Sequence, residues 1–472
     1  MANSETKRRL WLRLLIGIAA GLPVALLLMN ETGMIAGRPA AAVAADALTL
    51  IAVPLLLLVL TYFKLKLWAR VLIALALGIG FGLLWQEGAI ALEPIGDIFI
   101  NLIKMLIVPL ILTTLVAGVA SMGHPATMGR LGLKAFGLYL VTTAFAIMIG
   151  LSFGVLFEPG VGLSIEGVEP RAAAAEGKSL VDRLVELVPT NPVEALASAN
   201  VLQIILFALL LGVGIVVAGE PGRPLKEFFH SASEVMLRIT RFVMEVAPFG
   251  VFALVGVVAA TYGLDVLESL AKLILVVYAA CLTHIVVVYW GLIRFVANLP
   301  VIRFIRGVFD AQAVAYSTAS SSATLPVTIT VARDNLGVDK STSGFVLPLG
   351  ATINMDGTAL YLGILAVFAA QIFNVDLSMA DYGAIVLTAT LASIGSAGIP
   401  SASLVLMSIV LSSVGFSGEQ IGIVLAMIFG VDRVMDMMRT LTNITGDSMV
   451  SVLVSKSENA LDEETYRTPA VR

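Results

Sequence analysis

Residues 431–447 read VDRVMDMMRTLTNITGD, and no other stretch of the chain constrains the fold as strongly. The segment lies inside the apolar run 419–456. On a helix that turns about 100° per residue, its polar side chains share one stripe about 80° wide: Asp432, Asp436, Arg439, Asn443 and Asp447. A charge at the centre of a bilayer costs about 2.5–3.5 kcal/mol, so the stripe should face a polar chamber. One arginine cannot neutralise three carboxylates, and the surplus negative charge predicts bound cations.

The composition of the whole chain indicates a membrane protein. Of 472 residues, 58% are apolar and only 13% are charged, whereas soluble domains carry about 25% charged residues. Apolar runs long enough for a helix to cross a bilayer recur along the chain. These runs are continuous rather than alternating, which favours helices over a barrel. We therefore expect an all-α polytopic membrane protein with the lipid bilayer as a partner, and the small net charge gives no indication of nucleic-acid binding.

Basic clusters between the apolar runs predict the threading. The positive-inside rule places the cluster Lys7–Arg9 and the later Lys/Arg clusters in the cytoplasm. The spans expected in the first part of the chain are 10–29, 48–63, 68–86, 94–120, 131–157, 199–218, 232–261 and 266–293. The first of these is interpreted as a retained span rather than a cleaved signal peptide. Both termini then lie in the cytoplasm, and the protein is expected in the inner (plasma) membrane.

Two segments in the last third do not read as single spans. Segments 307–335 and 383–415 have polar centres, Ser317–Ser322 and Ser393–Ser401, marked by glycine or proline. Their apolar arms of about 10–15 residues are too short to cross a bilayer. We therefore predict two re-entrant helical hairpins, the first opening to the cytoplasm and the second to the outside. A long span follows each hairpin, so the two halves form an inverted repeat that brings broken helices together near the midplane.

The expected span 339–373 carries Asn354, Met355 and Asp356 between Gly350 and Gly357. Glycines on both sides predict that the helix unwinds there. Unwound backbone turns carbonyl oxygens towards a cavity, and carbonyls with a carboxylate suit a hard cation such as Na⁺.

The hairpin tips supply groups of the opposite character. Ser320–Ser322 and Ser401–Ser403 would lie at the N-termini of the second arms, and helix N-termini bind carboxylates. Arg439 offers a guanidinium for a second carboxylate, and Asp436 offers a carboxylate for an ammonium group. Together these groups fit an amino acid with an acidic side chain. His284 lies in an apolar run and is interpreted as a packed core residue, with a proton relay as the alternative.

Four motifs in the right order give the chain a specific resemblance. They are Ser320–Pro326, Asn354–Thr358, Ser393–Pro400, and Asp436–Thr440 with Asn443 and Thr445–Asp447. Over roughly residues 68–456 the chain resembles the dicarboxylate/amino acid:cation symporter family, which contains archaeal aspartate transporters and vertebrate excitatory amino acid transporters.

The resemblance implies a homotrimer with glutamate-transporter-like inverted repeats, in which a transport domain moves against a fixed scaffold, as in an elevator. It implies scaffold spans over 68–130 and 196–262, a transport-domain span over 131–157, an extracytoplasmic loop over 158–195, and the rest of the transport domain over 263–456. Outside this family core we expect an extra N-terminal helical hairpin over 1–67 and a cytoplasmic tail over 457–472. Within 263–456 the expected elements are span 266–293, hairpin 307–335, span 339–373, hairpin 383–415 and span 419–456.

Site residues follow from the same resemblance. Implied substrate contacts are Ser321, Ser322, Met355, Thr358, Ile399, Ser403, Asp436, Arg439, Thr440 and Asn443, with Asp436 on the amino group and Arg439 on the side-chain carboxylate. Implied sodium ligands are Gly350, Asn443 and Asp447 at one site, Thr352, Ser393, Ile394 and Ser396 at a second, and Tyr139, Thr142, Thr143, Asn354 and Asp356 at a third. Na⁺ would be the coupling ion, with no cofactor and no catalytic residue.

The chain departs from the family pattern at several positions. Ala319 stands where archaeal members have an arginine, and Met437 where vertebrate members have one, while this chain has an extra arginine at Arg433. Leu362 replaces a glutamate that the vertebrate carriers link to proton movement, and Ser403 replaces a glycine common at the second tip.

Three other functions compete with a sodium-driven carrier of aspartate or glutamate. The nearest is a proton-driven C4-dicarboxylate symporter of the same family, which would need neither Asp447 nor an ammonium partner at Asp436. An intramembrane aspartyl protease would need a glycine where Ile444 stands. A pure ion channel does not explain a site shaped for an amino acid.

Overall fold

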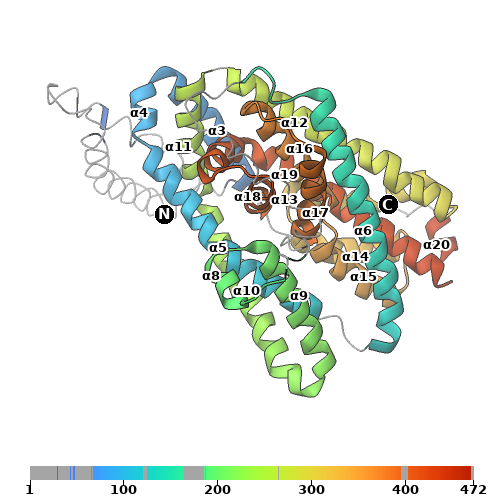
Figure 1. Cartoon of the computed structure of the whole chain (residues 1–472). Coiled ribbons are helices and arrows are strands. Elements are labelled where there is room, and N and C mark those ends of the chain that lie inside the picture. The colour runs from blue at the N-terminus through green and yellow to red at the C-terminus, as the bar shows by residue number, and fades with distance from the viewer. Residues whose placement is uncertain are drawn as a thin grey trace, which may run out of the picture. The chain divides into compact units, whose positions relative to one another are not determined.

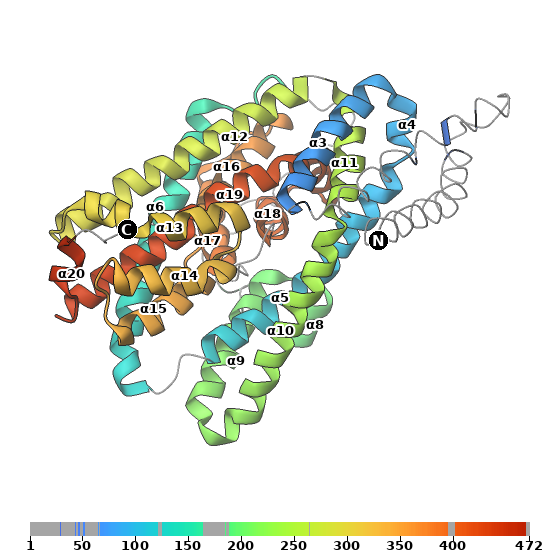
Figure 2. The same ribbon diagram turned by 180° about the vertical axis from the view of Figure 1, so that it is seen from behind.

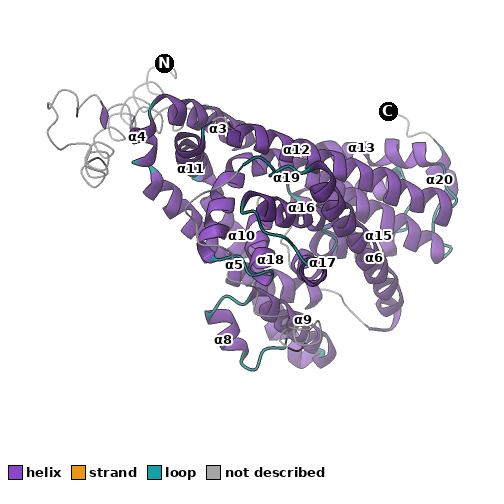
Figure 3. Ribbon diagram, turned by 45° about the horizontal axis from the view of Figure 1, so that its top comes forward, coloured by secondary structure: helices purple, strands orange, loops and turns teal. Residues whose placement is uncertain are grey.

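The structure, a computed structural model, describes residues 67–120, 125–163, 188–263, 265–394 and 402–468, with a few single residues elsewhere. Every regular element in these ranges is helical, and none is a strand (Figure 3). The expectation of an all-α chain is confirmed for this part, since helices alone satisfy their backbone groups within one apolar segment. The expected N-terminal spans 10–29 and 48–63 lie outside these ranges, as does most of loop 158–195.

The described helices of the first half run from residue 67 to residue 262. They are α3 (Leu67–Leu84), α4 (Gln86–Ile90), α5 (Glu93–Ala120), α6 (Pro125–Phe157), α8 (Pro192–Ala197), α9 (Val201–Ala218), the 3₁₀ turn η1 (Glu220–Gly222), α10 (Arg223–Glu245) and α11 (Ala247–Tyr262).

The helices of the second half begin at residue 265. They are α12 (Asp265–His284), the π-helical turns η2 (Ile285–Tyr289) and η3 (Leu292–Val296), α13 (Val301–Thr318), α14 (Ser321–Asp334), α15 (Lys340–Ile353), α16 (Asp356–Ile372), α17 (Met379–Ile394), α18 (Ala402–Ser413), α19 (Gly418–Ser457) and α20 (Glu463–Arg467).

Among the described residues, four helical segments are each long and apolar enough to cross a membrane: Gln86–Ala120, Arg130–Phe157, Glu268–Val296 and Lys340–Ile372. They coincide with four of the predicted spans. Two further predicted spans correspond to the shorter apolar helices Ala69–Leu84 and Gln203–Ala218. Helix α19 has 40 residues, but its purely apolar part is Gln420–Phe429, because the charges of the polar stripe begin at Asp432.

The span predicted over 232–261 is a bent pair of helices that together are long and apolar enough to count as one broken span. The chain forms α10 and α11 there, and the segment is bent by 51° between Glu245 and Ala247. Pro248 lies in the first turn of α11, where its missing N–H and fixed φ favour a helix start and disfavour continuation of the preceding helix. The count of apolar residues did not reveal this break, because a single proline hardly lowers the mean hydropathy of the segment.

The chain divides into two compact units, and the first contains residues 67–105, 240–270 and 425–431 of the described part. In this unit α3 and α11 pack together along their length, in blue and green in Figure 1. The contact depends on small residues. A β-carbon on Gly78 would lie 2.7 Å from the carbonyl oxygen of Phe252, and one on Gly82 would lie 2.2 Å from that of Gly256. Such close backbone approach is typical of helix packing in membranes.

The second unit contains the described residues of 106–239, 271–424 and 432–472. Its packing centres on α16, all of whose residues are buried except Gln371. Helix α16 lies against α6, where a β-carbon on Gly150 would lie 2.2 Å from the carbonyl oxygen of Leu360. A helix that is apolar all round is expected to be buried by its neighbours, and α16 fits this rule.

Each of the two segments predicted as hairpins forms a pair of helices in the second unit. Helices α13 and α14 pack against each other, as do α17 and α18, and Figure 2 shows the first pair in yellow and orange. Between α13 and α14, Ala319 adopts a left-handed conformation with φ of 50°, and Ser320 caps α14 by accepting a hydrogen bond from the N–H of Ala323. The re-entrant placement of both pairs in a bilayer stays a prediction.

Candidate functional site

The segment 340–372 is two helices with a break between them. Asn354 ends α15 with φ of −93° and ψ of 87°, and Met355 precedes α16 with φ of −115° and ψ of 53°. Both residues are buried. The break was expected from the flanking glycines. It starts α16 at Asp356, so that this carboxylate lies at a helix N-terminus, where negative charge is stabilised.

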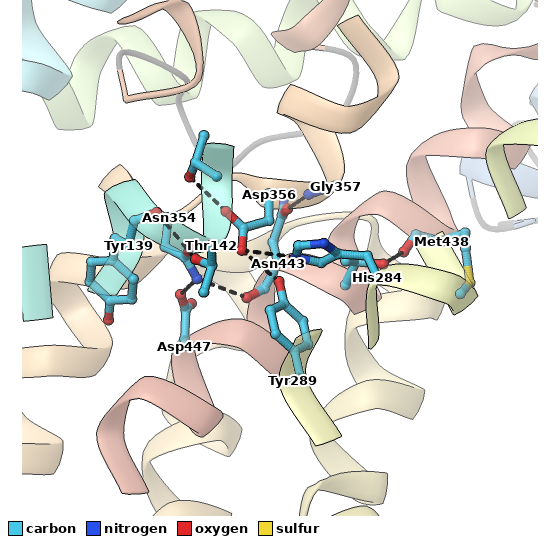
Figure 4. A network of polar contacts seen from close by, with 12 residues as sticks. Tyr139, Thr142, His284, Tyr289, Asn354, Asp356, Gly357, Met438, Asn443 and Asp447 are labelled. Atoms are coloured by element: carbon cyan, nitrogen blue, oxygen red, sulfur yellow. Dashed lines mark hydrogen bonds and ion pairs between the residues drawn. The ribbon is translucent and has the colours of Figure 1, made fainter. Parts of the chain in front are cut away.

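Asp356 is fully buried, and three side chains contact its carboxyl group (Figure 4). The hydroxyl of Thr143 donates to Oδ1 over 2.6 Å, and the phenol of Tyr289 donates to Oδ2 over 2.8 Å. Nε2 of His284 lies 3.3 Å from the same Oδ2. The carboxylate of Asp356 on α16 therefore has neighbours from three other elements, α6, α12 and the π-helical turn η2. The two partners His284 and Tyr289 were not predicted as site residues.

A π-helical turn explains why His284 and Tyr289 reach the same atom. Residues five apart on an α-helix point about 140° away from each other, since each residue turns about 100°. The chain changes to a π-helix over Ile285–Tyr289, and a π-helix pairs residues i and i+5. The two rings consequently lie edge to face with centroids 4.7 Å apart. No periodicity of apolar residues signals such a turn, which is why the sequence did not reveal this pair.

A second buried carboxylate, Asp447, lies beside the helix break. Nδ2 of Asn354 donates to its Oδ1 over 2.8 Å. Gly350 is essential to this geometry, because a β-carbon there would lie 2.4 Å from Oδ1 of Asp447 and 2.6 Å from the phenol oxygen of Tyr139. Oδ1 of Asn354 is buried and has no hydrogen-bond partner in the described part of the chain. A carboxylate oxygen and a phenol oxygen thus lie close together beside Gly350, with the Asn354 amide bonded to the same carboxylate.

In the described part of the chain, the basic side chain beside these two carboxylates is that of His284. Within the described ranges, neither Asp356 nor Asp447 forms an ion pair with a lysine or an arginine; His284 alone lies beside Asp356. Buried charges are normally paired or bound to a cation. The same ranges contain no cluster of three or more His, Cys, Asp and Glu that could hold a resident metal ion. The oxygen-rich ligand set suits a hard, weakly held cation such as Na⁺.

Asn443 joins α19 to the helix break. Its Oδ1 accepts a hydrogen bond of 2.7 Å from the N–H of Gly357, and its Nδ2 lies 3.2 Å from the sulfur of Met355. Thr358 and Thr440 are also buried. Gly357 allows this close approach, since a β-carbon there would lie 2.4 Å from the carbonyl oxygen of Arg439.

Arg439 is fully buried and lies among acidic and aromatic groups. Its Nη1 is 2.9 Å from Oδ1 of Asp432, its Nη2 donates to Oδ1 of Asp436 over 2.9 Å, and its guanidinium stacks on Tyr361 with 3.8 Å to the ring centroid. Tyr361 also donates to Oδ1 of Asp432 over 2.9 Å. Sequence reasoning placed Asp432 on the polar stripe but assigned it no contact, and it missed Tyr361, because pairing across helices cannot be read from one helix.

The serines at the tip of the first helix pair differ in exposure: Ser321 is buried, whereas Ser322 is exposed. At the second pair, Ser403 is buried and its hydroxyl has no partner within the described ranges. Ile399 and Ser396 lie outside those ranges.

The remaining predicted ligands are buried or half-buried, and their hydroxyls bond locally. Thr142 donates to the carbonyl of Tyr139 over 3.1 Å, Ser393 to that of Thr390 over 2.8 Å, and Thr352 to that of Pro348 over 3.4 Å. Ile394 is the last residue of α17. The network of Figure 4 thus joins the predicted first and third sodium sites, but not the second.

Comparison with known proteins covers most of the chain. The sequence model of the family described as the sodium:dicarboxylate symporter family matches residues 67–457. All the groups described above fall within this range.

Some individual relatives are named for the symport of glutamate or aspartate, and others for the transport of C4-dicarboxylates. A proton/sodium-glutamate symport protein of Geobacillus stearothermophilus is 36% identical over 381 residues, which cover 79% of this chain and 89% of that protein. A proton/glutamate-aspartate symporter of Escherichia coli (strain K12) is 38% identical over 384 residues, covering 79% and 86%. A C4-dicarboxylate transport protein of Bacillus subtilis (strain 168) is 33% identical over 391 residues, covering 81% and 91%.

Proposed function

Because the chain belongs to the sodium:dicarboxylate symporter family, we propose that it takes up L-aspartate or L-glutamate together with Na⁺. The chain is an integral membrane symporter of acidic substrates and not an enzyme. The identity of the substrate and of the coupling ion is our proposal. It rests on the chemistry of the buried groups and on what the relatives are named for.

One observation carries the assignment of Na⁺. Asp356 and Asp447 are buried around the same helix break without a lysine or arginine to neutralise them in the described part. Leaving two such charges uncompensated would be strongly unfavourable. Oxygen atoms of Asn354, Tyr139 and Thr143 surround them, and these are ligands of the kind that Na⁺ accepts. Cation binding would supply the missing charge, and substrate binding at the neighbouring groups would depend on it.

The polar groups on α19 support an amino acid as substrate. Asp436 would take the ammonium group, and Arg439 would take the side-chain carboxylate once it exchanges one of its two acidic partners for the substrate. The serines at the two tips, with Met355, Thr358, Thr440 and Asn443, would complete the contacts. Thr352, Ser393, Ile394 and Ser396 would hold a further sodium ion through backbone oxygens.

We further propose that transport follows an elevator-type mechanism in a homotrimer. The scaffold would comprise 68–130 and 196–262, and the moving domain 131–157 and 263–456. Both termini would face the cytoplasm of a cell with the protein in its inner membrane. The close fit of α16 against α6 supports a rigid moving body, since packed helices shift as units.

A proton-coupled C4-dicarboxylate symporter is the alternative, and one observation favours it. Asp436 already pairs with Arg439, so it does not require an ammonium group from the substrate. The relative from Bacillus subtilis is named for C4-dicarboxylate transport. A dicarboxylate without an amino group could therefore occupy the same place.

Uptake into proteoliposomes distinguishes the two functions. Labelled L-aspartate, L-glutamate and succinate would be compared under an inward Na⁺ gradient and under a pH gradient alone. We expect uptake of the amino acids to follow the Na⁺ gradient. Uptake of succinate driven by the pH gradient without Na⁺ would establish the alternative and overturn our proposal.

A further inference from the structure

Arg433 is a buried arginine on α19 that the proposed function does not use. It is 6% exposed, and its Nη2 donates a hydrogen bond of 3.1 Å to the carbonyl oxygen of Thr318. Thr318 is the last residue of α13, and Ser320 caps α14 two residues later. The hydrogen bond therefore places the Arg433 guanidinium at the tip of this helix pair.

Two nitrogen atoms of this guanidinium lack partners. Nε and Nη1 are buried, and neither has a hydrogen-bond partner among the described residues. A buried donor without an acceptor costs free energy, more so when it is charged. An arginine held in this way is prepared for a ligand that accepts two parallel N–H bonds, and carboxylates do so.

The N-terminus of α14 adds to this preference for an anion. Helix α14 has 14 residues and begins at Ser321. The first N–H groups of any α-helix have no acceptor within the helix, and they carry a partial positive charge. Arg433 contacts Thr318 at the end of α13, and these N–H groups belong to the residues that follow Ser320. Both features favour a negatively charged group near this turn.

Arg439 differs from Arg433 in its partners. It forms ion pairs with two carboxylates and stacks on one aromatic ring, although its Nε and Nη1 also have no hydrogen-bond partner among the described residues. Arg433 instead donates a hydrogen bond to a neutral carbonyl. We propose that Arg433, with the N-terminus of α14, binds a carboxylate of the substrate, a role additional to that of Arg439. This inference rests on the proposed function, since it assumes that the substrate is a dicarboxylate, with or without an amino group.

The test measures binding rather than transport. Wild type, Arg433→Gln, Arg433→Lys and Arg306→Gln would be purified in detergent, and thermal unfolding would be followed with Na⁺ alone and with Na⁺ plus increasing L-aspartate or succinate. Arg306 is an exposed arginine on α13 and serves as the matched control. Ligands that bind the folded state raise the unfolding temperature by an amount that grows with the logarithm of ligand concentration divided by Kd, so titration reports the affinity.

We expect Arg433→Gln to weaken the binding of the dicarboxylate by about 10- to 100-fold, the range for a lost hydrogen-bonded charge. Arg433→Lys should restore part of the affinity, because it keeps the charge but not the two-pronged geometry. The shift produced by Na⁺ alone should stay unchanged in all variants. Arg306→Gln should behave as wild type.

Two results would overturn the inference. Affinity for both dicarboxylates within threefold of wild type in Arg433→Gln would show that Arg433 does not touch the substrate. A parallel loss of Na⁺ and dicarboxylate binding would show that it only supports the fold at Thr318. If wild type binds succinate but not L-aspartate, the proposed amino acid substrate fails, and the comparison of variants with succinate still decides the role of Arg433.

Discussion

Tyr289 donates a hydrogen bond of 2.8 Å to Oδ2 of Asp356, from a π-helical turn to the first residue of another helix. Both side chains are fully buried. The same oxygen has His284 at 3.3 Å, while Oδ1 accepts from Thr143. The carboxylate is thereby fixed in one orientation before any ion arrives. Fixed ligands lose less entropy on binding, so this shell should govern affinity for the cation.

Replacing Tyr289 by phenylalanine tests this role. Loss of a hydrogen bond to a buried carboxylate costs about 1.5 kcal/mol or more, so we expect the Na⁺ concentration for half-maximal uptake to rise about tenfold. The maximal rate should change less. The control is Tyr382→Phe, at a half-buried tyrosine on α17. If the half-saturating Na⁺ concentration of Tyr289→Phe lies within twofold of that of wild type, Tyr289 does not contribute to the cation site.

Two glycines on α15 form a matched pair for the cation site. A β-carbon on Gly350 would overlap Asp447 and Tyr139, whereas one on Gly344 would meet only Nη2 of Arg333, at 3.6 Å. We expect Gly350→Ala to reduce Na⁺ affinity at least tenfold, because the Asp447 carboxylate must move aside, and Gly344→Ala to leave it unchanged. Titration of Na⁺-dependent thermal stability measures both. Equal Na⁺ affinities in the two variants would show that Gly350 and Asp447 do not take part in cation binding.

Arg439→Cys should destabilise the protein as well as alter its specificity. The change removes the guanidinium that forms ion pairs with the buried Asp432 and Asp436, and breaking a buried ion pair costs about 3–5 kcal/mol. Adding Asp432→Asn should recover part of this loss, since it removes one uncompensated charge. Thermal unfolding of the single and double variants measures whether Asp432→Asn recovers part of the stability lost in Arg439→Cys. Undiminished L-aspartate uptake by Arg439→Cys would refute its role in binding the side-chain carboxylate.

A pH-dependent contact lies beyond the membrane spans. Hydrogen bonds from Lys134 and Arg130 hold the pKa of the Glu458 carboxyl below its ordinary value. A lowered pKa means that the ionised group stabilises the folded state at pH values above about 4.3, its ordinary value, and that this contribution disappears as pH falls through the folded-state pKa. The unfolding temperature of Glu458→Gln should therefore lie below that of wild type at pH 7.

The difference between Glu458→Gln and wild type should begin to narrow below about pH 4.3 and should vanish once the pH lies below the lowered folded-state pKa of Glu458. Glu234→Gln, at an exposed glutamate on α10, should show no such narrowing. A gap between wild type and Glu458→Gln that does not narrow as the pH falls below about 4.3 would mean that the contact does not contribute through its charge.

Those parts of the site that lie within one segment could be predicted from sequence. The break at Asn354 and Met355 was predicted from glycines on both sides, and the structure has it there. The polar stripe of α19 was predicted from helical periodicity, and its members Asp432, Asp436 and Arg439 do contact one another. Both signals are local, since they need only the spacing of residues along one helix.

Contacts between different helices could not be predicted from the sequence. Tyr361 lies in an apolar helix and gives no sign that it will hold Asp432. His284 was interpreted as a packed core residue, and it is buried, but it lies against a carboxylate. The bend within the span expected over 232–261 was missed for a related reason, since hydropathy averages over Pro248 and the bend beside it. Such features depend on backbone geometry that average composition does not record.

The π-helical turn Ile285–Tyr289 also restricts how this segment can change in length. A π turn holds one residue more than the α turn it replaces, so deleting a residue there would simply close it into regular α-helix. The helix would survive and remain long enough to span, yet everything after the deletion would be rotated about its axis. Shortening this stretch by one position should therefore be tolerated by folding and not by ion recognition, whereas many apolar exchanges within it should be tolerated by both.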